Sequence, residues 1–69
     1  MERDPVISSN IASIGYEPEN ETLEVEFKTS GIYQYFNVPA FIHERLMNAD
    51  SIGRFFNAEI KNAYPSGKL

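Results

Sequence analysis

One short segment alternates apolar and charged residues strictly, and this alternation limits the possible folds more than any other feature. Residues 23–28 read Leu-Glu-Val-Glu-Phe-Lys. Successive side chains of a β-strand point to opposite faces, so the pattern is typical of a strand with one buried face. Residues 10–16 alternate more weakly, and a turn-forming segment with Pro and Asn, residues 17–21, lies between the two. We predict a hairpin that places Tyr16 opposite Leu23, Ile14 opposite Val25 and Ala12 opposite Phe27.

A second hairpin is predicted around residues 28–36, and the sequence leaves its register open. With a two-residue Ser30-Gly31 turn, Tyr33 and Tyr35 stand on the face away from the core. With a three-residue loop that has Gly31 in the left-handed conformation, Tyr33 lies opposite Phe27 and both tyrosines are in the core. We favour the second register, because small three-stranded cores recruit Tyr readily.

Two short helices are predicted after the strands. Pro39 suits the first position of a helix, and residues 40–47 have helical spacing. Ser51 can cap a second helix whose apolar residues share one face: Ile52, Phe55, Phe56 and Ile60. The predicted fold class is therefore α+β, a three-stranded antiparallel β-meander followed by two short helices packed on one face.

The 69-residue chain has no cysteine and is long enough for one small domain. We expect this domain to span residues 6–65, with flexible termini at 1–5 and 66–69. No apolar stretch suits a signal peptide or a membrane span, so we expect a cytoplasmic protein with no membrane partner. The net charge of −4 argues against a strongly cationic nucleic-acid binder. Residues 1–38 carry −5 and residues 39–69 carry +1, so the acidic character belongs to the first half.

Catalytic chemistry is sparse, and we expect no enzyme, no cofactor, no metal and no small-molecule substrate. His43 is the single histidine, and we expect it to be a solvent-facing helix residue because no nucleophile motif accompanies it. Glu17, Glu19 and Glu21 lack the glycine and the terminal bidentate ligand of a calcium loop. Neither a nucleophile elbow nor a phosphate-binding glycine loop is present.

Five residues form the candidate site: Tyr33, Tyr35, Arg54, Asn57 and Lys61. Bases stack on aromatic rings while guanidinium or ammonium groups hold phosphates, so this set suits single-stranded nucleic acid. The same residue types are enriched in protein–protein interfaces. A third interpretation is that the rings are core residues and the cations only solubilise the surface.

The order and spacing of several segments resemble the KTSC domain, a small domain found at the C-terminus of some lysyl-tRNA synthetases and as a free-standing bacterial or phage protein. The segments that carry the resemblance are Ser9–Tyr16, Leu23–Phe27, Tyr33-Gln34-Tyr35 with Val38-Pro39, and Ser51–Asn57 with Ile60 and Tyr64-Pro65. The family often has basic residues just after the Asn of the last block and near Ile60. Here Ala58-Glu59 intervenes and only Lys61 remains.

The resemblance implies a domain of uncharacterised function for which RNA binding is suggested by the synthetase neighbours. Aminoacylation is not implied, because no catalytic domain accompanies this chain. We therefore hypothesise a non-enzymatic, weak and salt-sensitive RNA-binding module. The alternative is a protein–protein interaction adaptor that uses an exposed sheet edge or an aromatic strip.

Overall fold

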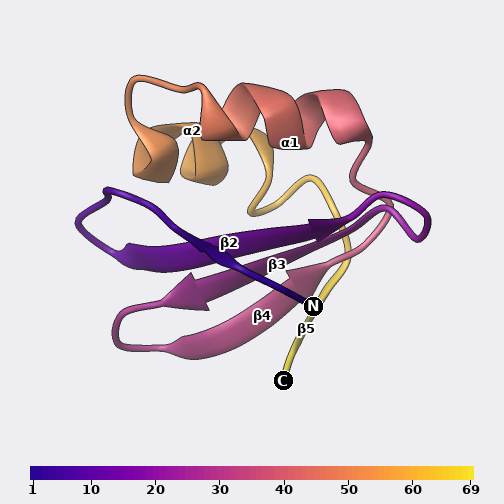
Figure 1. Ribbon diagram of the computed structural model, residues 1–69, viewed down its shortest axis with the longest axis horizontal. Coiled ribbons are helices and arrows are strands. Elements are labelled where there is room, and N and C mark those ends of the chain that lie inside the picture. The colour runs from indigo at the N-terminus through magenta and orange to yellow at the C-terminus, as the bar shows by residue number, and fades with distance from the viewer.

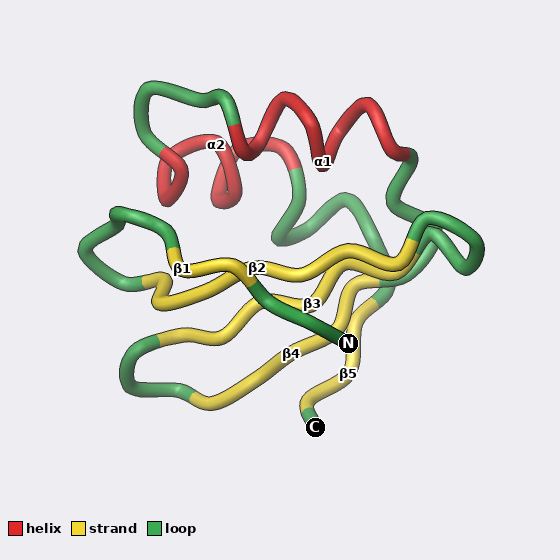
Figure 2. Tube along the Cα trace, viewed as in Figure 1, coloured by secondary structure: helices red, strands yellow, loops and turns green.

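The computed structural model describes residues 1–69 as two helices lying on one face of an antiparallel sheet (Figure 1). The strands are β1 (Asp4–Pro5), β2 (Ile11–Glu17), β3 (Thr22–Phe27), β4 (Gly31–Tyr35) and β5 (Ser66–Lys68); the helices are α1 (Ala40–Met47) and α2 (Ile52–Glu59). The strand order in the sheet is β1-β2-β3-β4-β5 (Figure 2). Neither helix is long and apolar enough to cross a membrane.

The predicted α+β class with two helices is confirmed, but the sheet has five strands and not three. The two additional strands come from the terminal segments. Asp4 pairs with Ile14 at one edge, and Lys68 pairs with Tyr33 at the other. Strands of two and three exposed residues have no apolar alternation, so backbone pairing alone defines them.

The register of the β2–β3 hairpin is confirmed at two of the three predicted pairs, Tyr16 with Leu23 and Ile14 with Val25. At the third, Phe27 pairs with Ile11 and not with Ala12, because the register shifts at a bulge between Ile11 and Ser13. A bulge opposes two residues to one on the partner strand. It turns Ile11 fully into the core while Ala12 is half-buried.

The β3–β4 hairpin places Tyr33 and Tyr35 on the core side of the sheet, as the favoured register predicted, but the pairing is two residues away from that register. Tyr33 pairs with Val25, and Phe27 pairs with Gly31. Gly31 has a φ of 95°, the left-handed conformation that the prediction required. The two-residue turn, which would have exposed both rings, is not formed.

The helices close the core over the sheet. Ile42 and Leu46 of α1 and Phe56 of α2 are buried in the same cluster as Leu23 and Val25. The ring of Phe56 meets the rings of Phe27 and Tyr35 edge-on, with centroids 5.5 and 5.2 Å apart. As predicted, Ser51 caps α2 by accepting a hydrogen bond from the Arg54 backbone amide.

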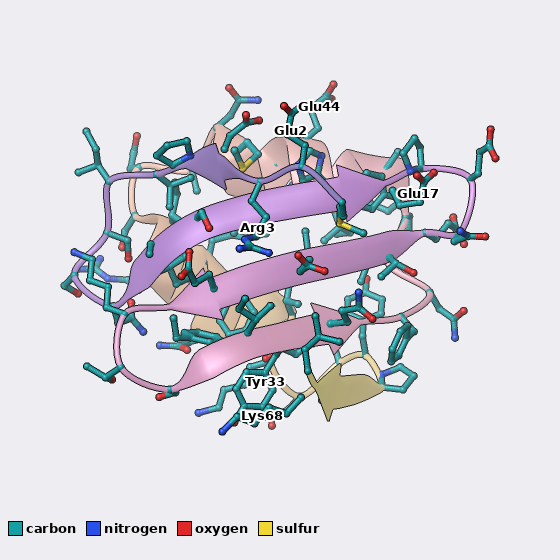
Figure 3. All side chains as sticks on the ribbon, turned by 60° about the horizontal axis from the view of Figure 1, so that its bottom comes forward. Glu2, Arg3, Glu17, Tyr33, Glu44 and Lys68 are labelled. Carbon is teal, nitrogen blue, oxygen red and sulfur yellow. The ribbon has the colours of Figure 1, made fainter.

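The N-terminal segment, residues 1–3, crosses the other face of the sheet and carries a polar network (Figure 3). The Arg3 guanidinium forms an ion pair with Glu24 and donates from Nε to Ser13 Oγ over 3.0 Å. Gln34 donates to the second oxygen of Glu24 over 2.9 Å, and Ser13 donates to Glu26 over 2.8 Å. Every buried polar side-chain atom has a partner.

This network sets the ionisation of Glu24, which is only 4% exposed. Burial by itself would raise the pKa of the carboxyl, but hydrogen bonds from Gln34 and Arg3 and the charge of Arg3 act in the opposite direction. Their sum lowers the pKa below the usual value, so the carboxylate is charged at neutral pH.

Candidate nucleic-acid interface

An open pocket of 460 Å³ lies between α2, the β3–β4 hairpin and the segment that leads to β5. Its aromatic walls are Phe27, Tyr33, Tyr35 and Phe56, and its polar lining is Asn10, Ser30, Asn57, Lys61, Asn62 and Ser66. We call it the amide pocket, because three asparagines line it. Lys61 is the one charged residue in its lining.

Four of the five predicted site residues line this pocket: Tyr33, Tyr35, Asn57 and Lys61. Arg54 does not. It lines a second pocket of 290 Å³ beside the first amino acids of α2, and Asn57 belongs to the lining of both. The predicted residues thus come together around Asn57, although Arg54 and Lys61 lie in different pockets.

The two tyrosines contribute less than predicted. Tyr35 is only 5% exposed and packs edge-on against Phe56, so its ring offers no face on which a base could stack. Burial, with a smaller contribution from Tyr33, raises the pKa of its hydroxyl, which stays protonated. Tyr33 is half-buried, and the Nζ of Lys68 lies 5.9 Å from its ring centroid (Figure 3). Lys68 therefore already occupies a cation–π position on the more exposed ring.

Four polar residues of the amide pocket were not predicted from the sequence: Asn10, Ser30, Asn62 and Ser66. They come from the β1–β2 loop, the β3–β4 loop, the turn after α2 and β5. No motif joins them, since exposed Asn and Ser are ordinary loop residues. Only the close approach of the β1–β2 loop to α2 brings Asn10 in, where a Cβ on Gly53 would lie 3.0 Å from Asn10 Oδ1.

His43 is not the solvent-facing residue that the sequence predicted. Its ring stacks on Tyr16 with centroids 4.6 Å apart and is half-buried, while the Tyr16 hydroxyl donates to the Val38 carbonyl over 2.6 Å. Burial lowers the pKa of His43, although Asp4 and Glu44 act in the opposite direction. His43 lines neither pocket, and no three His, Cys, Asp or Glu side chains are grouped so that they could hold a metal ion.

Fold and pocket define a small α+β domain with a polar groove beside its second helix. The KTSC domain family model matches residues 7–64, and the chain belongs to this family. A crystal structure of a KTSC domain protein from Yersinia pestis is similar, with a TM-score of 0.97 and 47% sequence identity, over 99% of this chain and 96% of that one.

Sequence relatives place similar segments in proteins of two sizes. An uncharacterised protein of Stutzerimonas stutzeri is 44% identical over 61 residues, which is 88% of this chain and 86% of that protein. A lysine–tRNA ligase of a Nostoc species is 43% identical over 61 residues, but these make up only 11% of the ligase. A similar domain is therefore nearly a whole small protein in one case and a minor part of a large one in the other.

Proposed function

We propose that this KTSC domain is a non-catalytic binding module that takes up single-stranded RNA weakly in the amide pocket. The observation that carries the proposal is that Asn10 of the β1–β2 loop and Asn57, Lys61 and Asn62 at the end of α2 line one open pocket. Its volume of 460 Å³ lies within the range of roughly 300–1,000 Å³ that is usual for small-ligand sites. An unpaired base with its sugar is a ligand of that class.

The lining suits recognition of a base by its hydrogen-bonding edge. An asparagine side chain offers both a carbonyl acceptor and an NH₂ donor, as the edges of bases do. Because Tyr35 and Phe56 are buried edge-on against each other, ring stacking contributes little. We therefore expect discrimination between bases, which a stacking platform would not give.

The charges suit weak and salt-sensitive binding. Lys61 is the single cation in the lining of the amide pocket, and the whole chain carries −4. Each phosphate contact to a single strand contributes a slope of about −0.7 to the plot of log affinity against log salt. A domain that holds one or two phosphates should thus have a slope of about −0.7 to −1.4.

The family relationship supports an RNA ligand. Several relatives of this chain are lysine–tRNA ligases, enzymes that by name act on tRNA, and each contains a segment similar to it. A small domain attached to such an enzyme has RNA within reach. The support extends only to binding, because the segment is about a tenth of each ligase.

The alternative of a protein adaptor has less support. Its aromatic strip required Tyr33 and Tyr35 on the outer face, and both lie on the core side of the sheet. The sheet edges are β1 and β5, which have two and three residues. Edges this short offer little backbone for an added strand.

The test is a titration of fluorescently labelled six-nucleotide single-stranded RNAs, one of each base, at about 50 and 200 mM salt. Wild type should bind at low salt with a preference among the bases. Lys61→Ala should weaken binding and reduce the salt slope by about 0.7, and Asn57→Ala should reduce the base preference. Lys28→Ala is the matched control, because Lys28 is exposed and lines neither pocket.

The proposal fails if no RNA binds at about 50 mM salt. It also fails if Lys61→Ala and Lys28→Ala change the affinity and its salt slope equally. In that case any attraction would come from the general surface charge and not from the amide pocket.

A further inference from the structure

We infer that the two pockets form one groove along α2 that binds at least two consecutive nucleotides, with a base in the amide pocket and a neighbouring phosphate at Arg54. This inference rests on the proposed function and extends it from a pocket for one base to a path for a strand. It gives Arg54 a role separate from that of Lys61.

The first argument is that both walls of the groove are continuous. On the α2 side, Asn57 lines both pockets. On the opposite side, Asn10 lines the amide pocket and Ser8 lines the second pocket, and the Ser8 hydroxyl donates to Asn10 Oδ1 over 3.1 Å. At Gly53, which lines the second pocket, the two walls are in contact, since a Cβ there would lie 3.0 Å from Asn10 Oδ1 and 3.4 Å from Ser8 Oγ, so Asn57 is the residue that joins the two linings.

The second argument is the spacing of the ligand-binding side chains. Arg54 and Asn57 are three residues apart within α2 and so lie on the same side of it, while Lys61 lies in the turn that follows the helix.

The third argument is the chemistry of the second pocket. The Arg54 guanidinium can donate two parallel hydrogen bonds to a phosphate, and hydroxyls of Ser8, Ser9 and Ser51 lie in the same lining. Asp50 also lines it and repels a second phosphate. One phosphate at Arg54 is therefore the most that this end of the groove accommodates.

The hydrogen bonds of the Asn10 side chain indicate which base this pocket would prefer. Asn10 Oδ1 accepts the hydrogen bond from Ser8 and lies against Gly53, so the Asn10 NH₂ group is the more accessible part for a ligand. A base that presents an acceptor at this position is expected, and Ser8→Ala would free Oδ1 and relax that preference.

The experiment measures the affinity of oligonucleotides of one base that carry no terminal phosphate and increase in length from a nucleoside to a tetranucleotide, at about 50 mM salt. Wild type should gain about tenfold from the nucleoside to three nucleotides and little thereafter. Arg54→Ala should remove most of this gain and leave the affinity for the nucleoside unchanged. Asn57→Ala should weaken every length. Arg45→Ala, an exposed arginine of α1 that lines neither pocket, is the matched control.

The outcomes separate the two proposals. If the nucleoside binds as tightly as the trinucleotide, or if Arg54→Ala and Arg45→Ala behave alike, the two-nucleotide groove is overturned while the amide pocket stands. If no length binds to wild type, both proposals are overturned. Two-dimensional amide NMR spectra of each variant establish that the fold is intact, so that lost affinity is not lost structure.

Discussion

The two faces of the sheet are both covered, but by different means. On one face α1 and α2 bury an apolar cluster with Leu23 and Val25 at its centre, and both are 0% exposed. On the other face residues 1–3 lie over Glu24, which pairs with Arg3 and is 4% exposed although it sits between those two residues in β3. Three consecutive residues of one strand are thus buried, one of them as a charged group.

The difference shows how the two faces are stabilised. The helix-covered face gains stability from removing apolar surface from water, which needs no particular partner atom. The face covered by residues 1–3 gains it from a few directed contacts. Arg3 and Gln34 hold the buried Glu24 carboxylate, and Ser13 accepts a hydrogen bond from Arg3. We expect the first face to dominate the free energy of unfolding, and the Glu24 network of the second face to add a pH dependence that the apolar cluster does not have.

The largest expected effect on the free energy of unfolding comes from a substitution on the helix-covered face. Phe56→Ala removes a ring that is 1% exposed and contacts both Phe27 and Tyr35. Such changes cost about 3–5 kcal/mol, which is much of the roughly 3–10 kcal/mol expected for 69 residues. Urea unfolding followed by circular dichroism measures it. Phe41→Ala, at a ring that is 59% exposed, should change stability by less than about 0.5 kcal/mol. Similar costs for both variants would contradict the assignment of the core.

An intermediate effect on the free energy of unfolding is expected on the face that residues 1–3 cover. A Cβ on Gly15 would lie 2.5 Å from the backbone oxygen of Glu2 and 3.0 Å from Cγ of Arg3, so Gly15→Ala must push residues 1–3 away. Arg3→Ala removes the partner of Glu24 directly. Each should cost about 1–2 kcal/mol in urea unfolding.

Because both variants break the same contact, the Arg3→Ala/Gly15→Ala double variant should cost clearly less than the two single costs added together. Glu2→Ala keeps the backbone oxygen and serves as the control, with little effect expected. Fully additive costs would mean that the segment 1–3 and the Arg3–Glu24 pair stabilise the fold independently.

The smallest effect is a pH dependence with two separate windows. The folded pKa of His43 lies below its ordinary 6.5 and that of Glu24 below 4.5, so in each window the unfolded chain binds more protons. Both contributions are therefore complete above the unfolded pKa and decline on acidification, for His43 as the pH falls below about 6.5 and for Glu24 below about 4.5.

Unfolding free energies measured from pH 7.5 to pH 3 test this assignment. His43→Gln should flatten the upper window and leave the lower one, and Glu24→Gln should do the reverse. A change of the same window by both variants would show that the stacked pair of His43 and Tyr16 and the Arg3–Glu24 network are coupled, against the separation of the two faces.

Much of the fold could be predicted because its signals are local. The alternation at residues 23–28, the Ser51 cap and the left-handed Gly31 each depend on neighbours in the chain, and the structure has all three. The register of the second hairpin was two residues off, since three-residue loops at residues 28–30 and at residues 29–31 put the same side chains on the core face. The register in which Tyr33 pairs with Val25 closes the core under Phe56, so tertiary packing selects it and the local sequence does not.

The candidate site was predictable only in part, for the same reason. Asn57 of α2 and Lys61 of the turn that follows it are close in the chain, and their residue types already indicated a polar surface. Asn10 and Ser66 reach the same pocket from opposite ends of the chain, and that depends on how β5 and the β1–β2 loop pack.

The sequence by itself determined the class of the fold, the apolar face of each main strand and the helix that carries the polar groove. Each of these depends on a periodicity that repeats within a few residues. Tertiary structure decided what lies on the second face of the sheet and what surrounds Asn57. The alternation assigned Glu24 to the face opposite Leu23, but only the crossing of Arg3 buried it. Contacts between residues far apart in the chain arise from packing and loop closure, and no local pattern encodes them.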